Sequence, residues 1–248
     1  MSLDKILRPS YNFDLIRIGK NNDGGYLVGR NSLESSRYLI SLGIGDDWSF
    51  EEDFLKKNTS NVIVKCVDDN LDKKFLIKNI IKQLLFVLYN KNFQYLNNLV
   101  KNYFSFLKIE KKLNLIKKRI FYNELDEILN KIPGGGGVFL KIDIEGSEYR
   151  ILDSILSNQD KLLGLVIEFH DCDLHKDRIH NFVKHLDLTL IHIHGNNCAK
   201  TDLNGDITVF EVTFDKFPIK IGEVNRLPNL LDFPNDASEK EIILKFNP

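Results

Sequence analysis

The sequence has few cysteines, no long apolar run and almost no net charge. Its three cysteines, Cys66, Cys172 and Cys198, are widely spaced and form no CxxC pair, which argues against a disulfide framework and a thiolate zinc site. The longest apolar run, residues 84–89, is far shorter than the roughly 20 residues that span a bilayer. Residues 1–10 contain no apolar segment typical of a secretory signal. We therefore expect a cytoplasmic protein without a transmembrane helix.

Charge is distributed unevenly along the chain. The formal net charge of −1 gives no overall attraction to nucleic acid, and we expect no nucleic-acid partner. Residues 71–119, however, contain twelve Lys or Arg against Asp72 and Glu110, a local balance of +10 that leaves −11 for the remainder. The simpler interpretation is a solvated, lysine-rich helix face. The alternative is a surface that attracts an anionic substrate, a nucleotide or a lipid headgroup.

Apolar strand-like segments alternate with helical ones, which predicts an α/β fold with a mostly parallel sheet and helices on both faces. The expected strands lie at 38–44, 61–69, 119–122, 138–144, 162–170, 188–195 and 206–214. The last two have no helix between them, which predicts an antiparallel hairpin at one edge of the sheet. We predict a single domain over 1–248, with a lead-in at 1–37 and a basic helical insertion at about 71–119.

Glycines and polar residues gather at the carboxyl ends of these strands, where ligands bind in an open α/β sheet. They are Gly43 and Gly45, Asp68 and Asp69, Asp143 and Glu145, Glu168 and His170, and His192, His194, Asn196 and Asn197. Their position predicts that one rim of the sheet forms the functional site.

The segment VFLKIDIEG, residues 138–146, places Lys141, Asp143 and Glu145 on one face of a strand. A charge on a strand buried on both faces costs several kcal/mol unless it is paired or reaches solvent. We therefore expect Asp143 and Glu145 to reach the open rim. Lys141 should have a partner such as Asp143 or a carboxylate of a neighbouring strand. The alternative is an edge strand with one wet face.

The glycines after the first sheet strand suit the close approach of a cofactor. Gly43-x-Gly45 lacks the third glycine of GxGxxG, because Trp48 stands in its place, so an NAD-type pyrophosphate site is disfavoured. An acid at the end of the second strand, Asp68 or alternatively Asp69, can accept the hydroxyls of a ribose. A nucleoside cofactor without a buried pyrophosphate fits S-adenosylmethionine better than NAD.

Six segments together resemble the FkbM-type family of S-adenosylmethionine-dependent methyltransferases. They are RIGKNNDGGYLV (17–28), SLGIGDDWSFEEDF (41–54), CVDD (66–69), LKIDIEGSEYRIL (140–152), LVIEFHD (165–171) and IHIHGNN (191–197). LKIDIEGSE is the most specific of them. The basic insertion and much of the C-terminal tail fall outside the resemblance.

The resemblance implies a Rossmann-like class I methyltransferase fold, with a seven-stranded sheet and a reversed final strand. It implies methyl transfer to a hydroxyl, which we expect to belong to a sugar of a surface glycan. A small-metabolite or lipid-linked hydroxyl, or a non-catalytic cofactor-binding module, are the alternatives. By position, Gly43 and Gly45 would line the cofactor, Asp68 would hold its ribose, and Asp143 and Glu145 would face the reacting centre.

His170 and Glu145 are the candidates for the base that removes the hydroxyl proton. Together with Asp143 and His194 they are the four residues that we expect to be catalytic. The same four, Asp143, Glu145, His170 and His194, could also form a divalent-metal site of oxygen and nitrogen ligands. The alternative, which we favour, is that the histidines have a structural role and are hydrogen-bonded to neighbouring carboxylates. No residue is therefore assigned as a metal ligand. The acceptor could be anionic. Its identity, and the formation of a homo-oligomer, stay open.

The segment Asp23-Gly24-Gly25-Tyr26 precedes the first sheet strand and predicts a hairpin turn in which the glycines supply positive φ angles. Tyr26 either packs over the rim of the cofactor site or simply follows this turn.

Overall fold

A computed structural model of the chain describes residues 3–90, 93–133, 136–203, 205–223 and 226–247, without the side chains of residues 83, 85–90 and 93–95. The predicted domain at 1–248 and the predicted insertion at 71–119 both include residues 91 and 92, which lie outside these ranges.

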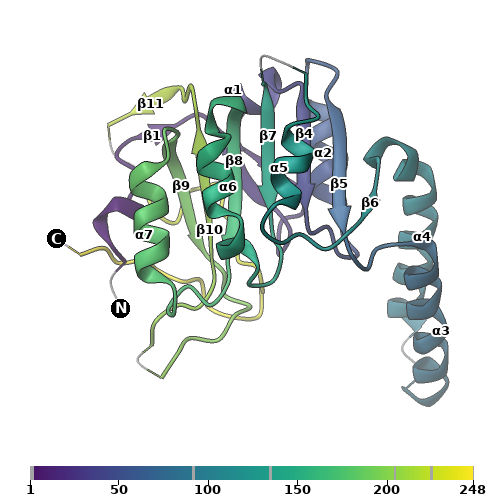
Figure 1. The fold of residues 1–248 in the computed structure, drawn as a ribbon. Helices are drawn as coiled ribbons and strands as arrows, with labels where there is room; N and C mark the ends of the chain where they lie inside the picture. Colours follow the sequence, from purple (N-terminus) through teal and green to yellow (C-terminus); the bar gives the residue numbers. More distant parts are fainter. Residues whose placement is uncertain (1–2, 91–92, 134–135, 204, 224–225, 248) are drawn as a thin grey trace.

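A seven-stranded sheet with the order β6-β5-β4-β7-β8-β10-β9 forms the centre of the molecule (Figure 1). Its strands are β4 (Tyr38–Leu42), β5 (Ile63–Asp68), β6 (Ile116–Lys117), β7 (Val138–Ile142), β8 (Leu162–Phe169), β9 (Thr189–Gly195) and β10 (Phe210–Asp215). β4 to β8 pair in parallel, whereas β10 runs antiparallel to both β8 and β9. The predicted α/β fold, its antiparallel edge and the reversed final strand are confirmed.

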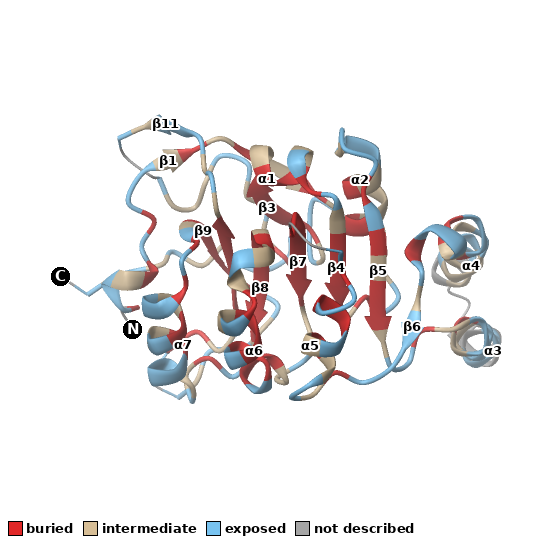
Figure 2. Cartoon of the chain, turned by 45° about the horizontal axis from the view of Figure 1, so that its top comes forward, coloured by how far each residue is buried: buried red, intermediate tan, exposed pale blue. Residues whose placement is uncertain are grey.

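Helices cover both faces of this sheet. Side chains of α5 (Glu124–Leu129), α6 (Leu152–Ser157) and α7 (Lys176–His185) pack on one face, in a core that includes Leu140. Side chains of α2 (Ser49–Lys57) pack on the other, in a core that includes the next residue along β7, Phe139. Neighbouring residues of a strand point to opposite faces, so β7 is buried on both sides (Figure 2).

The basic insertion forms two helices, α3 (Lys73–Asn90) and α4 (Phe93–Leu113), which project beyond the β6 edge of the sheet (Figure 1). The predicted strand at 119–122 is wrong. Only Ile116 and Lys117 pair with β5, because the chain then turns inward and buries Ile120 in the core. Within the part of the chain that the structure describes, no helix is long and apolar enough to cross a membrane.

The lead-in forms the predicted hairpin, in which β2 (Leu15–Ile18) pairs antiparallel with β3 (Tyr26–Gly29). Gly24 has a φ of +82°, the left-handed region that favours glycine. Helix α1 (Arg30–Ser35) follows β3 directly. The Thr213 hydroxyl of β10 donates to the Leu27 carbonyl at 2.6 Å. The hairpin is thereby fixed across the sheet, and Tyr26 stands beside the rim.

The remaining elements are short. Strand β1 (Asn12–Phe13) pairs with β11 (Lys220–Gly222), and Leu3 forms a bridge with Phe246, so the two ends of the chain meet beside the sheet (Figure 1). Single 3-10 turns lie at η1 (Lys5–Leu7), η2 (Glu148–Arg150) and η3 (Gln159–Lys161).

Candidate active site

Two adjoining cavities lie at the carboxyl ends of the strands, beside the point where the strand order reverses between β4 and β7. The larger, of about 880 Å³, is lined among others by Gly43, Gly45, Asp68, Asp143 and Glu145. The smaller, of about 240 Å³, is lined among others by Asp143, Glu145, Glu168, His170 and Asn196. Six of the seven predicted site residues therefore surround one continuous region, and the exception is His194.

The two predicted glycines have different structural reasons to be glycine. Gly43 has a φ of +74°, and a Cβ atom built on it would lie 1.6 Å from the carbonyl oxygen of Asp143. Gly45 has a φ of +61°, and a Cβ atom there would meet no atom within 4 Å. Gly43 thus allows β4 and β7 to approach each other, whereas Gly45 presents open backbone to the cavity.

Asp68 organises the backbone on both sides of the larger cavity. Its Oδ2 accepts the N–H groups of Ile44 at 3.1 Å and Gly45 at 3.0 Å. Its Oδ1 accepts those of Asn70 at 2.8 Å and Leu71 at 2.7 Å. A carboxylate has about four lone-pair positions, so these amides occupy the capacity that the predicted ribose contact would need.

Asp69, the sequence-based alternative, lines the same cavity. Its side chain is 40% exposed, and its Oδ2 lies 3.9 Å from Nε of Arg119. Asn70 donates to its Oδ1. Asp69 therefore keeps lone pairs that can accept hydroxyl groups.

Lys141 explains how β7 carries charge inside the sheet. Its Nζ donates to the Gly43 carbonyl oxygen at 2.6 Å and lies 3.5 Å from Asp143 Oδ2. Burial opposes its charge, but Asp143, the buried Glu51 and Glu168 outweigh this and raise the pKa of Lys141. The expected partner Asp143 is confirmed, while Glu51 was not identified from the sequence. Lys141 therefore remains charged and ties β7 to the glycine loop.

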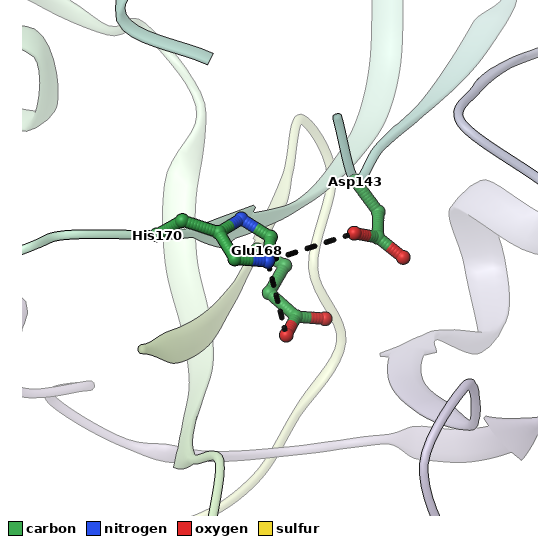
Figure 3. Close-up of side chains that lie close together, drawn as sticks. All are labelled: Asp143, Glu168 and His170. Carbon is green, nitrogen blue, oxygen red and sulfur yellow. Dashed lines mark ion pairs between the residues drawn. The ribbon is translucent and has the colours of Figure 1, made fainter. Parts of the chain in front are cut away.

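His170 is surrounded by four carboxylates, two of which Figure 3 shows. Its Nδ1 lies 3.0 Å from Oε1 of Glu148, which is completely buried. Its Nε2 lies 3.5 Å from Glu145 Oε2, 3.9 Å from Glu168 Oε1 and 4.0 Å from Asp143 Oδ1. The Glu145 side chain is 87% exposed. The histidine thus bridges a buried acid and the open rim.

These surroundings change the acid–base behaviour of the cluster. Burial lowers the pKa of His170, but its hydrogen bond to Glu148 and the charges of Glu148, Glu168 and Asp143 raise it overall to about 9. Burial, followed by Asp143 and Glu211, raises the pKa of Glu168 to about 8. A protonated imidazole cannot accept a proton. At neutral pH this cluster therefore favours Glu145 over His170 as the base.

Tyr26 and Asn196 hold the carboxylates of the cluster. The Tyr26 hydroxyl is buried and lies 2.9 Å from Glu168 Oε2 and 3.1 Å from Asp143 Oδ2, so it can donate to either. Asn196 Nδ2 donates to Glu168 Oε1 at 2.8 Å. Tyr26 thus follows the predicted turn at the start of β3, and its hydroxyl also contacts two carboxylates at the rim, which the sequence did not predict.

His194 is buried among other partners. Its Nε2 lies 3.0 Å from Glu241 Oε1 and its Nδ1 lies 3.6 Å from Glu211 Oε2. It lines neither cavity. These contacts are those expected of a structural histidine that is hydrogen-bonded to carboxylates. They do not support the catalytic role predicted for His194.

No protein-family model matches the chain, and no curated protein matches it. Solved structures with a similar fold include precorrin-6y C5,15-methyltransferase from Geobacter metallireducens, with 14% identity over 76% of this chain and 85% of that chain, and a TM-score of 0.41. Another is an O-methyltransferase from Bacillus cereus in complex with SAH, with 10% identity over 75% and 76% of the chains and a TM-score of 0.40. Scores at this level assign no family, and the FkbM-type resemblance remains a prediction.

Proposed function

We propose that this chain is an S-adenosylmethionine-dependent O-methyltransferase. The observation that carries the proposal is the pair of adjoining cavities, which meet at Asp143 and Glu145. One has the open glycine backbone and the strand-end acids that suit a nucleoside. The other has a cluster of carboxylates and a histidine that can orient and deprotonate a hydroxyl. A methyl donor and an acceptor could therefore be held on either side of the same two side chains.

The larger cavity is the proposed cofactor site. The exposed backbone of Gly45 would contact the cofactor, and Asp68 or Asp69 would accept the ribose hydroxyls. The four amides already bonded to Asp68 favour Asp69. S-adenosylmethionine supplies an activated methyl group on a sulfonium, so the chain's own task is alignment and proton removal.

The smaller cavity is the proposed acceptor site. Its side chains Asp23, Glu168 and Asn196 can bond several hydroxyl groups at once, which suits a sugar of a surface glycan. Asp143 and Glu145 lie on the same wall, so an anionic group at this position would be repelled. The charges thus disfavour the anionic acceptor that the sequence left open. Glu145 would take the hydroxyl proton.

Calorimetry with S-adenosylmethionine, followed by a methyl-transfer assay over a panel of glycans, tests the proposal. We expect micromolar binding and transfer to at least one hydroxylated acceptor. Binding without transfer to any acceptor would favour a cofactor-binding module. A protein that does not bind S-adenosylmethionine at all would contradict the proposal.

A lipid-linked hydroxyl is the second candidate acceptor, and the surface of the insertion favours it. Ile77, Ile81 and Leu84 are exposed at helical spacing on α3, and Phe104 and Leu107 are exposed on α4. The segment 71–119, which carries these apolar side chains, has a charge balance of +10. A basic, partly apolar helical surface of this kind suits the interface of an anionic membrane.

A further inference from the structure

The side chains of Asp143, Glu168 and His170 converge on one point at the rim (Figure 3). Each offers one ligand atom, and these atoms all lie within 4.8 Å of one another. The His170 Nε2 is 4.0 Å from Asp143 Oδ1 and 3.9 Å from Glu168 Oε1. Two ligands at about 2.1 Å from a shared cation can be at most about 4.2 Å apart. Both distances from the imidazole therefore fit a shared cation, and the outer bound of 4.8 Å for the whole set needs a closing movement of at most about 0.6 Å.

Glu148 fixes the orientation of the His170 ring from the side of Nδ1, opposite the other carboxylates. Glu148 Oε1 accepts the N–H groups of Ile144 at 3.0 Å and Gly146 at 3.2 Å, which anchors this carboxylate beneath the rim. It lies 3.0 Å from His170 Nδ1, so Nε2 is turned toward the carboxylates. Metal-binding histidines commonly have this arrangement, in which the nitrogen that does not bind the metal donates to a carboxylate.

The two carboxylates are oriented as well. Tyr26 lies within hydrogen-bond distance of both Asp143 Oδ2 and Glu168 Oε2. The other oxygen of Asp143, Oδ1, is the one nearer to His170. Asn196 donates to Glu168 Oε1, which leaves that oxygen a second lone pair.

Negative charge is concentrated around this point. The carboxylates of Asp143, Glu145, Glu148 and Glu168 all lie within 4.0 Å of the imidazole of His170. Carboxylates gathered in this way favour a positive charge between them, which a divalent cation would supply.

We propose that Asp143, Glu168 and His170 bind one divalent cation. A set of two carboxylates and one imidazole suits Mn²⁺ or Zn²⁺ better than Ca²⁺, which takes oxygen ligands. Three protein ligands leave a position open for an acceptor hydroxyl, whose proton the cation would make more acidic. The binding site stands by itself, whereas this role for the cation rests on the proposed function. The proposal differs from the sequence-based interpretation, which favoured a structural role for His170 and no metal.

Titration of the chelator-treated full chain with MnCl₂, followed by calorimetry and by the electron paramagnetic resonance signal of free Mn²⁺, tests the site. We expect one Mn²⁺ per chain, and at least tenfold weaker binding in Glu168→Gln and in Asp143→Asn. Glu241→Gln is the matched control, because Glu241 also pairs with a buried histidine, His194, but lies outside the cluster. Its affinity for Mn²⁺ should equal that of the wild type.

Absence of Mn²⁺ binding to the wild type, or equal binding by wild type, Glu168→Gln and Asp143→Asn, would overturn the site. Circular dichroism shows which variants fold. Asp143 is half-buried at the rim, so Asp143→Asn keeps the test valid if Glu168→Gln unfolds. Parallel titration with S-adenosylmethionine separates the two proposals. Cofactor binding without Mn²⁺ binding refutes only the cation site, and the reverse result refutes only the methyltransferase.

Discussion

Lys141 Nζ donates a hydrogen bond of 2.6 Å to the carbonyl oxygen of Gly43, which joins a buried charge on β7 to the glycine loop after β4. The two residues belong to neighbouring parallel strands on either side of the point where the strand order reverses. The lysine therefore sets the position of the backbone that we propose to contact the cofactor.

Replacing this lysine should impair both stability and cofactor binding. Lys141→Met leaves Glu51 and Asp143 without their buried cation, and loss of one partner of a buried pair costs about 3–5 kcal/mol. We expect a loss of unfolding free energy of this order in urea and at least tenfold weaker binding of S-adenosylmethionine. The control is Lys56→Met, because Lys56 is exposed on α2. Wild-type stability and affinity in Lys141→Met would show that the contact with Gly43 is incidental.

The adjacent acids Asp68 and Asp69 should respond differently to substitution. Asp68→Ala removes the acceptor of four backbone amides. Each of these hydrogen bonds contributes about 1 kcal/mol net to stability. We therefore expect a lower unfolding free energy together with weaker cofactor binding. Asp69→Ala should weaken cofactor binding about tenfold without changing stability. Calorimetry and urea unfolding measure both. Wild-type affinity in Asp69→Ala would assign the ribose to Asp68.

The rim residues could be predicted from sequence because parallel strands end at the same edge of a sheet. Gly43, Asp68, Asp143 and His170 each follow an apolar segment of strand-like composition, so strand alternation alone was enough to bring them together. The short strand β6 could not be predicted in the same way. Two paired residues leave no periodic pattern.

The supporting residues were missed because their partners are distant in the sequence. Tyr26 is 117 residues from Asp143 and 142 residues from Glu168. Its position depends on how the lead-in hairpin packs across the sheet, and no local pattern records this packing. Glu148 is close in sequence to Glu145, but Glu148 begins a 3-10 turn and is buried, whereas the side chain of Glu145 is exposed.

The buried His194 predicts a dependence of stability on pH. Burial lowers the pKa of His194, but Glu211, Asp232 and Glu241 raise it overall from 6.5 to about 9. Because the folded state binds this proton more tightly than the unfolded state, the stabilisation is full below pH 6.5 and is lost as the pH rises through about 9. It amounts to roughly 3 kcal/mol at most.

Urea unfolding between pH 6 and pH 9.5 measures this effect. The wild type should lose unfolding free energy across the range, and His194→Gln should lose less. His170 also has a raised pKa and contributes to the pH profile of both proteins. The difference between the two profiles therefore gives the contribution of His194. Identical pH profiles would show that His194 is neutral in the folded protein.

Glu145 should matter for turnover and not for folding. Its side chain is 87% exposed, so Glu145→Gln should leave the unfolding free energy unchanged. Loss of a general base lowers the rate by about 10²–10⁴-fold, and we expect a fall in kcat of this size with unchanged affinity for S-adenosylmethionine. The matched control is Glu223→Gln, another exposed acid, which lies outside both cavities. A wild-type kcat in Glu145→Gln would exclude it as the base.

The helices of the insertion should bind anionic membranes. Basic residues near a lipid surface contribute about 1 kcal/mol each, and the attraction weakens with salt. We expect the chain to sediment with vesicles that contain phosphatidylglycerol, but not with phosphatidylcholine vesicles, and less at higher salt. The double variant Ile81→Ser and Leu84→Ser should weaken binding, because these exposed side chains of α3 would enter the interface. Ile63→Ser, an equally exposed position on β5, should have no effect. Equal sedimentation with both kinds of vesicle, or none with either, would show that the charge of the insertion serves solubility alone.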